Sequence, residues 1–307
     1  MSSSDFSAND HKLMARALQL AKRGITTTQP NPRVGCVIVK EGKIIAEGWH
    51  EKAGSAHAEI MALQQAGDQT RGATAFITLE PCSHHGKTPP CTDELIASGI
   101  SEVVAAMQDP NPLVAGQGMQ KLSHSGIKVR IGLLQEQAEK LNRGFISRMT
   151  RGRPWMTVKL AASLDGRTAM NSGESRWITG PQARADVQKL RAASSAVMTG
   201  SGTVLADDPS LTVRLEGIDW QPLRVVLDSH LSISDSAKIF KDGQPLLIAT
   251  AAAENDNRFQ QLKGLGVDIR RFPGQAGRVD TLSLLKCLAD DYSCNEVLIE
   301  AGSVVCG

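Results

Sequence analysis

Residues 57–67, HAEIMALQQAG, and residues 73–99, ATAFITLEPCSHHGKTPPCTDELIASG, contain the pattern that decides the fold of the first half of the chain. The first stretch is typical of a helix that a glycine closes. The second begins as an apolar strand over residues 73–79 and resumes, after a polar loop, as a short helix over residues 92–98 that Gly99 ends. A helix, a strand and a second helix in this order predict an α/β arrangement in which helices cover a sheet.

Three side chains at the ends of these elements form a metal-ligand pattern. His57 opens the first helix, Cys82 follows the strand and Cys91 precedes the second helix. One imidazole and two thiolates suit Zn²⁺, and three protein ligands leave open the fourth position where a catalytic zinc ion activates water near neutral pH. The N–H groups at the entry of the second helix favour thiolates. Glu59, two residues after His57, can carry a proton from that water to a ring nitrogen and a leaving amine.

The order His-x-Glu, Pro-Cys and a second cysteine is typical of zinc-dependent deaminases of nucleobase-like rings. Eight residues separate the cysteines here, where that signature has two, and the intervening loop is polar, basic and rich in turn residues. One alternative is that the cysteines only fill the core, and another is that His84 or His85 completes a structural site with four protein ligands. A nucleic-acid-editing deaminase and a non-enzymatic zinc-stabilised module also remain open. A Glu59→Gln variant that keeps metal and loses turnover would exclude the module.

The composition favours two ordinary domains without a nucleic-acid or membrane partner. The chain has 307 residues, of which 41% are apolar, enough for two cores. A formal net charge of +2 and 4% aromatic residues argue against single-strand binding, which needs a basic groove and stacking platforms. Residues 1–10 do not resemble a signal peptide, and no stretch reaches the ~20 apolar residues of a membrane helix. The chain is therefore expected to be soluble and cytoplasmic, and its six cysteines are too few for a disulfide framework.

The rest of the first half supplies further elements of the same α/β pattern. A first helix over residues 13–21 is expected to start from Asn9 and to end near Gly24. Two strands around Glu41-Gly42 predict a hairpin. The expected elements are the hairpin strands 34–39 and 43–46, the strands 102–107 and 128–133, and a closing helix over residues 135–149. Residues 150–154 are polar and contain Gly and Pro, and we place a domain boundary there.

The α/β pattern then restarts in a second domain. The expected strands cover residues 155–162, 196–199, 223–227, 246–249, 267–271 and 296–299, and the expected helices cover residues 181–193 and 281–288. A strand followed by Glu300-Ala301-Gly302 normally leads into a helix, so this domain looks incomplete at its C-terminus. No complete G-x-G-x-x-G is present, so a Rossmann fold has little support.

Several motifs together resemble the bifunctional riboflavin biosynthesis deaminase/reductase family. They are QPNPRVG at 29–35, HAE at 57–59, PCSHHGKTPPC at 81–91, KLAASLDGR at 159–167, TVLADDP at 203–209 and EAG at 300–302. The resemblance implies an α/β protein with a cytidine-deaminase-like mixed sheet covered by helices on both faces in residues 1–150. It implies a dihydrofolate-reductase-like α/β domain in residues 151–307.

The same resemblance implies two consecutive reactions on pyrimidine ribosyl phosphates. The first domain would deaminate 2,5-diamino-6-(5-phosphoribosylamino)pyrimidin-4-one with one Zn²⁺ per chain. The second would use NADPH to reduce the ribosyl chain of 5-amino-6-(5-phosphoribosylamino)uracil to a ribityl chain. Small molecules would be the partners, and a homo-oligomer is compatible with the sequence.

The resemblance also implies site residues. His57, Cys82 and Cys91 would hold zinc, and Glu59 would be the proton shuttle. The deaminase substrate would contact Asn31, His50, His84 and Lys87, of which Lys87 offers a point charge for phosphate. NADPH would lie near Ala161, Trp177, Thr203, Asp207 and Gly302. The reductase substrate would lie near Ser175, Arg191, Leu211, Arg214 and Glu300, where two arginines suit its phosphate.

Overall fold

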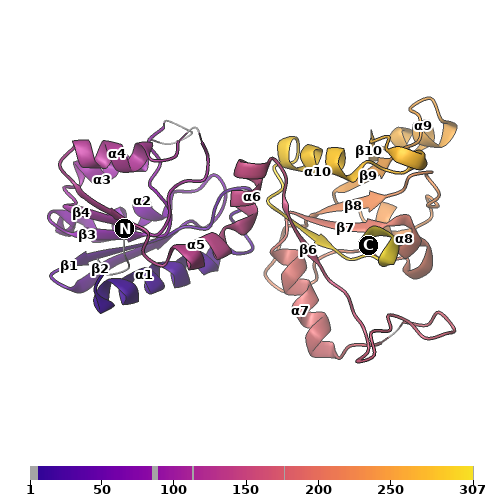
Figure 1. Ribbon diagram of the computed structural model, residues 1–307, viewed down its shortest axis with the longest axis horizontal. Coiled ribbons are helices and arrows are strands. Elements are labelled where there is room, and N and C mark those ends of the chain that lie inside the picture. Colours follow the sequence, from indigo (N-terminus) through magenta and orange to yellow (C-terminus); the bar gives the residue numbers. More distant parts are fainter. Residues whose placement is uncertain (1–5, 85–88, 113, 176, 307) are drawn as a thin grey trace. The chain divides into compact units, whose positions relative to one another are not determined.

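The chain divides into two compact units, Met1–Arg151 and Gly152–Gly307 (Figure 1). The structure is a computed structural model that describes residues 6–84, 89–112, 114–175 and 177–306. None of the helices in these ranges is long and apolar enough to cross a membrane.

The N-terminal unit contains a five-stranded mixed sheet in the order β2-β1-β3-β4-β5. The strands are β1 Gly35–Lys40, β2 Lys43–Trp49, β3 Thr74–Ile77, β4 Glu102–Ala105 and β5 Lys128–Ile131. β1 pairs antiparallel with β2 and β3, whereas β3, β4 and β5 run parallel. The predicted hairpin turn is confirmed: Glu41 and Gly42 both have positive φ, as a tight two-residue turn requires.

Helices cover both faces of this sheet, as predicted. Its strands alternate, so that Cys36 and Ile38 face one core while Val37 and Val39 face the other. The first core is closed by α2 Ala58–Ala66, α3 Cys91–Ala97 and α4 Gln117–His124. The second is closed by α1 Ala8–Ala21, α5 Gln135–Leu141 and α6 Arg143–Arg151. Short 3₁₀ turns at Lys22–Gly24 and Gly67–Thr70 follow α1 and α2.

Three expectations about helices in this unit differ from the structure. The cap of α1 is Ser7, not Asn9, because Ser7 and Asp10 form a reciprocal capping box. The single closing helix is two helices that meet at Asn142, whose buried side chain binds the backbone N–H and carbonyl of Arg33. Helix α4 was not predicted, because its N-cap Gly116 carries no capping side chain of its own.

The C-terminal unit contains a six-stranded, wholly parallel sheet in the order β10-β9-β8-β7-β11-β6. Its strands are β6 Trp155–Val158, β7 Ala196–Gly200, β8 Leu223–Leu227, β9 Leu246–Thr250, β10 Asp268–Arg271 and β11 Glu296–Ile299. All six predicted strands are present, with the first one shorter than expected. Because the strands are parallel, their carboxyl ends lie along one edge of the sheet, where open α/β sheets bind ligands.

Both faces of this second sheet are also covered. One core holds α10 Thr281–Asp290, and the other holds α8 Ser201–Asp207 and α9 Asn257–Gly264. Two further helices are α7 Pro181–Ala192, which begins with the predicted proline, and α11 Ser303–Cys306. Short 3₁₀ turns lie at Lys238–Phe240 and Gln275–Gly277. The segment between β6 and α7 has no regular structure among its described residues and extends away from the sheet (Figure 1).

Candidate functional site

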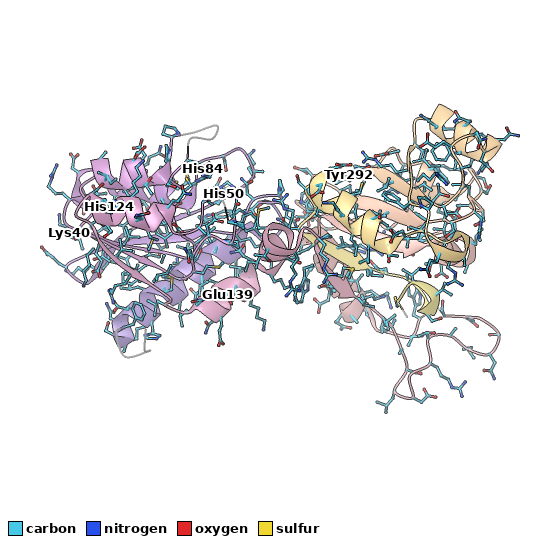
Figure 2. All side chains as sticks on the ribbon, turned by 45° about the horizontal axis from the view of Figure 1, so that its top comes forward. Lys40, His50, His84, His124, Glu139 and Tyr292 are labelled. Atoms are coloured by element: carbon cyan, nitrogen blue, oxygen red, sulfur yellow. The ribbon has the colours of Figure 1, made fainter. Side chains whose placement is uncertain are left out.

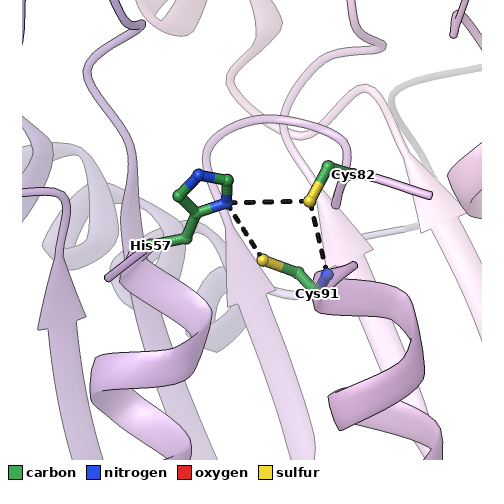
Figure 3. A group of neighbouring side chains, drawn as sticks. All are labelled: His57, Cys82 and Cys91. Atoms are coloured by element: carbon green, nitrogen blue, oxygen red, sulfur yellow. Dashed lines mark hydrogen bonds between the residues drawn. The ribbon is translucent and has the colours of Figure 1, made fainter. Parts of the chain in front are cut away.

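Helix starts and a strand end bring the three candidate metal ligands together. His57 is the N-cap of α2, Cys82 follows β3, and Cys91 is the first residue of α3 (Figure 3). The extended backbone of His57 starts α2 through its carbonyl, which accepts a hydrogen bond from the Met61 N–H. Its imidazole takes no part in capping and turns toward the two cysteines.

The spacing of the ligand atoms fits zinc. His57 Nδ1 lies 3.2 Å from Cys91 Sγ and 3.6 Å from Cys82 Sγ, and all three ligand atoms lie within 4.8 Å of one another. Zinc bonds of about 2.1 Å to nitrogen and 2.3 Å to sulfur, at tetrahedral angles, separate such atoms by roughly 3.5 Å. The donor set and its dimensions therefore match a three-ligand zinc site.

The two thiols differ in their acidity. A hydrogen bond with Cys91, followed by one with His57, lowers the pKa of Cys82 to about 4. The same bond with Cys82 raises the pKa of Cys91, and burial adds to the shift. The Cys91 backbone N–H also donates to Cys82 Sγ at 3.3 Å, so the start of α3 stabilises this thiolate. Zinc requires both sulfurs as thiolates, so metal binding releases the proton that Cys91 holds.

Glu59 lies in the first turn of α2 and is only 3% exposed. Burial raises its pKa to about 7, and the nearby charge of Cys82 adds to the effect, while His57 opposes it. A carboxyl group with a pKa near neutrality can both accept and return a proton at physiological pH. The positive charge of a bound cation would favour the carboxylate and oppose this shift.

Two polar side chains predicted to bind the deaminase substrate meet beside the ligand triangle. Asn31 Nδ2 lies 3.1 Å from His50 Nε2, and the His50 ring packs edge-on against His57 with centroids 5.5 Å apart. His50 Nδ1 lies 3.1 Å from the carbonyl of Ala56, which can only accept. Nδ1 therefore carries the proton, and Nε2 accepts from Asn31. Burial lowers the pKa of His50, which keeps its ring neutral.

The other two predicted substrate contacts lie on the loop between the cysteines. His84 is exposed, and Figure 2 shows its place and that of His50 in the N-terminal unit. Lys87 lies outside the described residues. The loop therefore brings His84 to the surface within two residues of the ligand Cys82.

Asp109 was missed in the sequence. It follows β4, and its carboxylate accepts a hydrogen bond from the Asn111 N–H at 2.8 Å. Burial raises its pKa, the charges of Glu80 and Cys82 also raise it, and His84 lowers it. These interactions place an acidic group beside the ligand loop. Only the strand order could have indicated this, because β3 and β4 are parallel neighbours whose carboxyl ends share one edge.

Residues predicted to bind NADPH follow three adjacent strands of the C-terminal unit. Ala161 comes after β6, Thr203 and Asp207 lie one turn apart on α8 after β7, and Gly302 comes after β11. β11 pairs with β6 on one side and with β7 on the other, so these segments leave the same edge of the sheet. A Cβ on Gly200 would lie 2.8 Å from Val305, which shows how closely α11 approaches the end of β7.

Of the five residues predicted to bind the reductase substrate, two pair with each other and the other three differ in their exposure. Arg191 and Glu300 form a largely buried bidentate ion pair with N–O distances of 2.5 and 3.1 Å, and Arg191 also donates to the Thr212 carbonyl. Leu211 is buried, whereas Arg214 is exposed and bonds through its backbone N–H to Gln188. Ser175 is half-buried in the segment before α7.

Trp177, predicted to contact NADPH, also lies in the segment before α7. It is 70% exposed, and the Arg184 guanidinium stacks 4.4 Å from its ring. The structure thus brings part of the predicted reductase site together at the sheet edge and leaves Trp177 on the surface.

Known proteins resemble the two units separately and together. The family model described as the cytidine and deoxycytidylate deaminase zinc-binding region matches residues 7–107, and that of the RibD C-terminal domain matches residues 154–307. The riboflavin biosynthesis protein RibD of Escherichia coli strain K12 is 49% identical over 97% of this chain and 83% of its own length. RibD of Haemophilus influenzae is 54% identical over 80% of this chain and 70% of its own length.

Two solved structures agree with these matches. Acinetobacter baumannii RibD, form 1, has a TM-score of 0.88 and 47% identity, and the match covers 97% of this chain and 82% of that one. A diaminohydroxyphosphoribosylaminopyrimidine deaminase/5-amino-6-(5-phosphoribosylamino)uracil reductase from Thermotoga maritima has a TM-score of 0.85 and 41% identity, with the same coverage. The chain therefore belongs to the RibD family of riboflavin biosynthesis enzymes, which join a zinc-dependent deaminase to an NADPH-dependent reductase.

Proposed function

We propose that the N-terminal unit removes the 2-amino group of 2,5-diamino-6-(5-phosphoribosylamino)pyrimidin-4-one by hydrolysis. The C-terminal unit then uses NADPH to reduce the ribosyl chain of 5-amino-6-(5-phosphoribosylamino)uracil to ribityl. The observation that carries this proposal is the ligand triangle of His57, Cys82 and Cys91 with the buried Glu59 beside it. The substrates follow from the likeness to the Thermotoga maritima enzyme over 97% of the chain.

In the deaminase site, His57, Cys82 and Cys91 hold the metal. Zinc held there would supply Lewis acidity, which lowers the pKa of water so that hydroxide is available near neutral pH. Glu59 takes one proton from the attacking water and gives it to the ring nitrogen, and it then carries the proton of the newly added hydroxyl to the amino group, which leaves as ammonia while the carbonyl forms. Its burial keeps bulk water away from the proton path.

Asn31 and His50 orient the pyrimidine. His50 accepts from the Asn31 amide, which fixes that amide and leaves the Asn31 carbonyl oxygen to accept from an N–H of the ring edge. His84 and Lys87, on the loop between the two cysteines, bind the ribosyl phosphate end of the substrate. A neutral His50 contributes hydrogen bonds without adding charge beside the metal.

In the reductase site, residues at the carboxyl ends of β6, β11 and β7 would hold NADPH, which would supply the hydride. Gly302 lets the cofactor phosphates approach the backbone at the start of α11. Thr203 and Asp207 contact the cofactor from α8, Ala161 from the segment after β6, and Trp177 by stacking.

The reductase substrate binds beside the cofactor. Arg191, Arg214 and Ser175 bind its phosphate and hydroxyl groups, with Leu211 packed against it, and Glu300 holds Arg191 in place. The bidentate pair fixes the direction of the guanidinium before the substrate arrives.

We place the enzyme in the cytoplasm, as a small-molecule enzyme that can form homo-oligomers. All six of its cysteines are free thiols, and the two ligand thiolates must stay reduced to hold zinc.

The test is ammonia release from the diaminopyrimidine ribosyl phosphate by the purified protein, with zinc content determined on the same sample. Activity with about one zinc per chain is the expected result, followed by NADPH oxidation when the cofactor is added. Zinc without ammonia release would contradict the deaminase assignment, and ammonia release without NADPH oxidation would contradict the reductase assignment.

A further inference from the structure

Glu80 is a buried acid whose described side-chain hydrogen bonds all come from backbone amides. It directly precedes Pro81-Cys82 and is 4% exposed. Its Oε2 accepts hydrogen bonds from the N–H groups of Asp109 at 3.0 Å and Gly116 at 2.9 Å. Its Oε1 accepts from those of Gly118 at 2.9 Å and Met119 at 3.2 Å. Four donors match the roughly four lone-pair sites of a carboxylate, so backbone N–H groups can satisfy both of its oxygen atoms.

These bonds make Glu80 the cap of a helix from which it is far away in sequence. Helix α4 begins after Gly116, which offers no capping side chain, and the orphan N–H groups of its first turn need acceptors. Glu80 Oε1 accepts from two of these N–H groups, those of Gly118 and Met119, and its carboxylate lies at the positive end of the helix dipole. Charge-assisted bonds of this kind are about twice as strong as neutral ones.

The start of α4 also touches the ligand segment directly. A Cβ on Gly118 would lie 2.1 Å from the carbonyl oxygen of Pro81, so only glycine permits this approach. The peptide that leads into Cys82 is therefore packed under α4 and held by the Glu80 side chain. On its other side, the Glu80 N–H donates to the carbonyl of Met107 and continues the pairing of β3 with β4.

One carboxylate thus joins three parts of the deaminase site. It fixes the segment that carries Cys82, the loop that begins at Asp109, and the start of α4. Partners outside the ligand shell that orient a ligand typically change metal affinity by about 10- to 100-fold when they are removed. The other two ligands are His57, the N-cap of α2, and Cys91, the first residue of α3, and none of the four Glu80 carboxylate bonds described above reaches either helix.

We propose that Glu80 is a positioning residue of the deaminase site, which holds Cys82 where the metal requires it by tying the segment 80–82 to the Asp109 loop and to α4. The proposal rests on the assignment of His57, Cys82 and Cys91 as zinc ligands. It does not require that the substrate be the one proposed above.

The test compares the zinc dissociation constants of wild type and Glu80→Gln, measured by competition with a chelator on the full chain. An amide keeps the size of the side chain but turns one acceptor into a donor that faces two N–H groups. We expect zinc to bind about 10- to 100-fold more weakly to folded Glu80→Gln. The control is Glu47→Gln, on β2 of the same unit, where Glu47 pairs with Arg16 at 2.6 and 2.7 Å; zinc affinity should not change.

A purely structural role would lower thermal stability and leave the zinc affinity of the folded protein at the wild-type value, and that result would overturn the proposal. If Glu80→Gln does not fold, amide hydrogen exchange of the wild-type protein tests whether the Glu80 bonds and zinc binding are coupled. The N–H groups of Gly118 and Met119 should exchange more slowly in the zinc-loaded than in the zinc-stripped protein, and equal rates would overturn the proposal. Zinc affinity is measured without substrate, so a wild type that binds zinc but releases no ammonia contradicts only the proposed function.

Discussion

The two units build their candidate sites in different ways. In the N-terminal unit, residues 57–59 and 82–91 include the three candidate zinc ligands and Glu59, the proposed proton shuttle, and the ligand atoms already lie within 4.8 Å of one another. In the C-terminal unit, the candidate residues come from separate segments between Ala161 and Gly302, and Trp177 is 70% exposed. A metal ion needs its ligands to converge on one point, whereas a dinucleotide lies along an edge. The difference suggests that the chain preforms the first site and that ligands complete the second.

The largest expected effect is the loss of deamination in the N-terminal unit while the reductase activity of the C-terminal unit is kept. Cys91→Ser removes a ligand and should reduce bound zinc to a small fraction of one per chain. Deamination should fall by well over the ~100-fold that loss of an outer-shell partner costs. Ammonia release and zinc content measure the loss, and NADPH oxidation with the deaminated substrate is the internal control, which should not change. If Cys91→Ser lost both activities equally, the prediction that the two sites work independently would be wrong.

The preformed part of the reductase site is tested next. Arg191→Met leaves the largely buried Glu300 carboxylate, 12% exposed, without its partner, and this should cost up to the ~3–5 kcal/mol that removing one member of a fully buried pair costs. Chemical unfolding should show this loss in the transition of the C-terminal unit. The double variant Arg191→Met/Glu300→Leu should recover part of it, since no charge is then left unpaired. An unchanged transition in Arg191→Met would show that the pair does not stabilise the fold.

Trp177 tests the part of the site that ligands complete. Trp177→Ala should change the free energy of unfolding by less than about 0.5 kcal/mol, because the side chain is exposed. Loss of stacking worth ~0.5–1.5 kcal/mol should raise the KM for NADPH by roughly 3- to 10-fold. Steady-state kinetics measure the change, with Met170→Ala, also exposed and in the same segment, as the matched control. An unaltered KM would remove Trp177 from the cofactor site.

The smallest effect concerns the framework of the N-terminal unit. Burial alone would raise the pKa of Asp10, but bonds from Arg130 and from Ser7 outweigh it and lower the pKa below its usual 3.8. The carboxylate therefore stabilises the fold above that pH and loses its contribution as the pH falls through its lowered pKa. Asp10→Asn should cost about 1 kcal/mol at pH 7 and less as the pH approaches 3. A deficit that is constant with pH would contradict this assignment.

The features that could be predicted from the sequence depend on residues near one another in the chain, and those that could not depend on residues far apart. The hairpin at Glu41-Gly42, the helix from His57 to Gly67 and the zinc ligands depend on residues close together in the chain, and they were predictable. The break at Asn142 depends on Arg33, 109 positions away, and the cap of α4 depends on Glu80, 38 positions from Gly118. Local patterns carry no signal for either contact.

The same reasoning explains why the reductase site was harder to predict. Its residues carry no local motif with a mechanism of its own, and they meet only because β6, β11 and β7 are neighbours although β11 comes last in the sequence. Without the strand order, only the family resemblance could connect Ala161 with Gly302. Asp109 was missed for a similar reason, since its place beside Cys82 depends on the pairing of β3 with β4.

The most direct test of the account is a coupled assay of wild type and Glu59→Gln, supplied with the diaminopyrimidine ribosyl phosphate and NADPH. The wild type should release one ammonia for each NADPH oxidised, with ammonia appearing first. Glu59→Gln should keep its zinc, deaminate about 10²- to 10⁴-fold more slowly, and oxidise NADPH at the wild-type rate once the deaminated substrate is supplied. A zinc-loaded Glu59→Gln that still releases ammonia at the wild-type rate would contradict the role of Glu59 and the mechanism built on it.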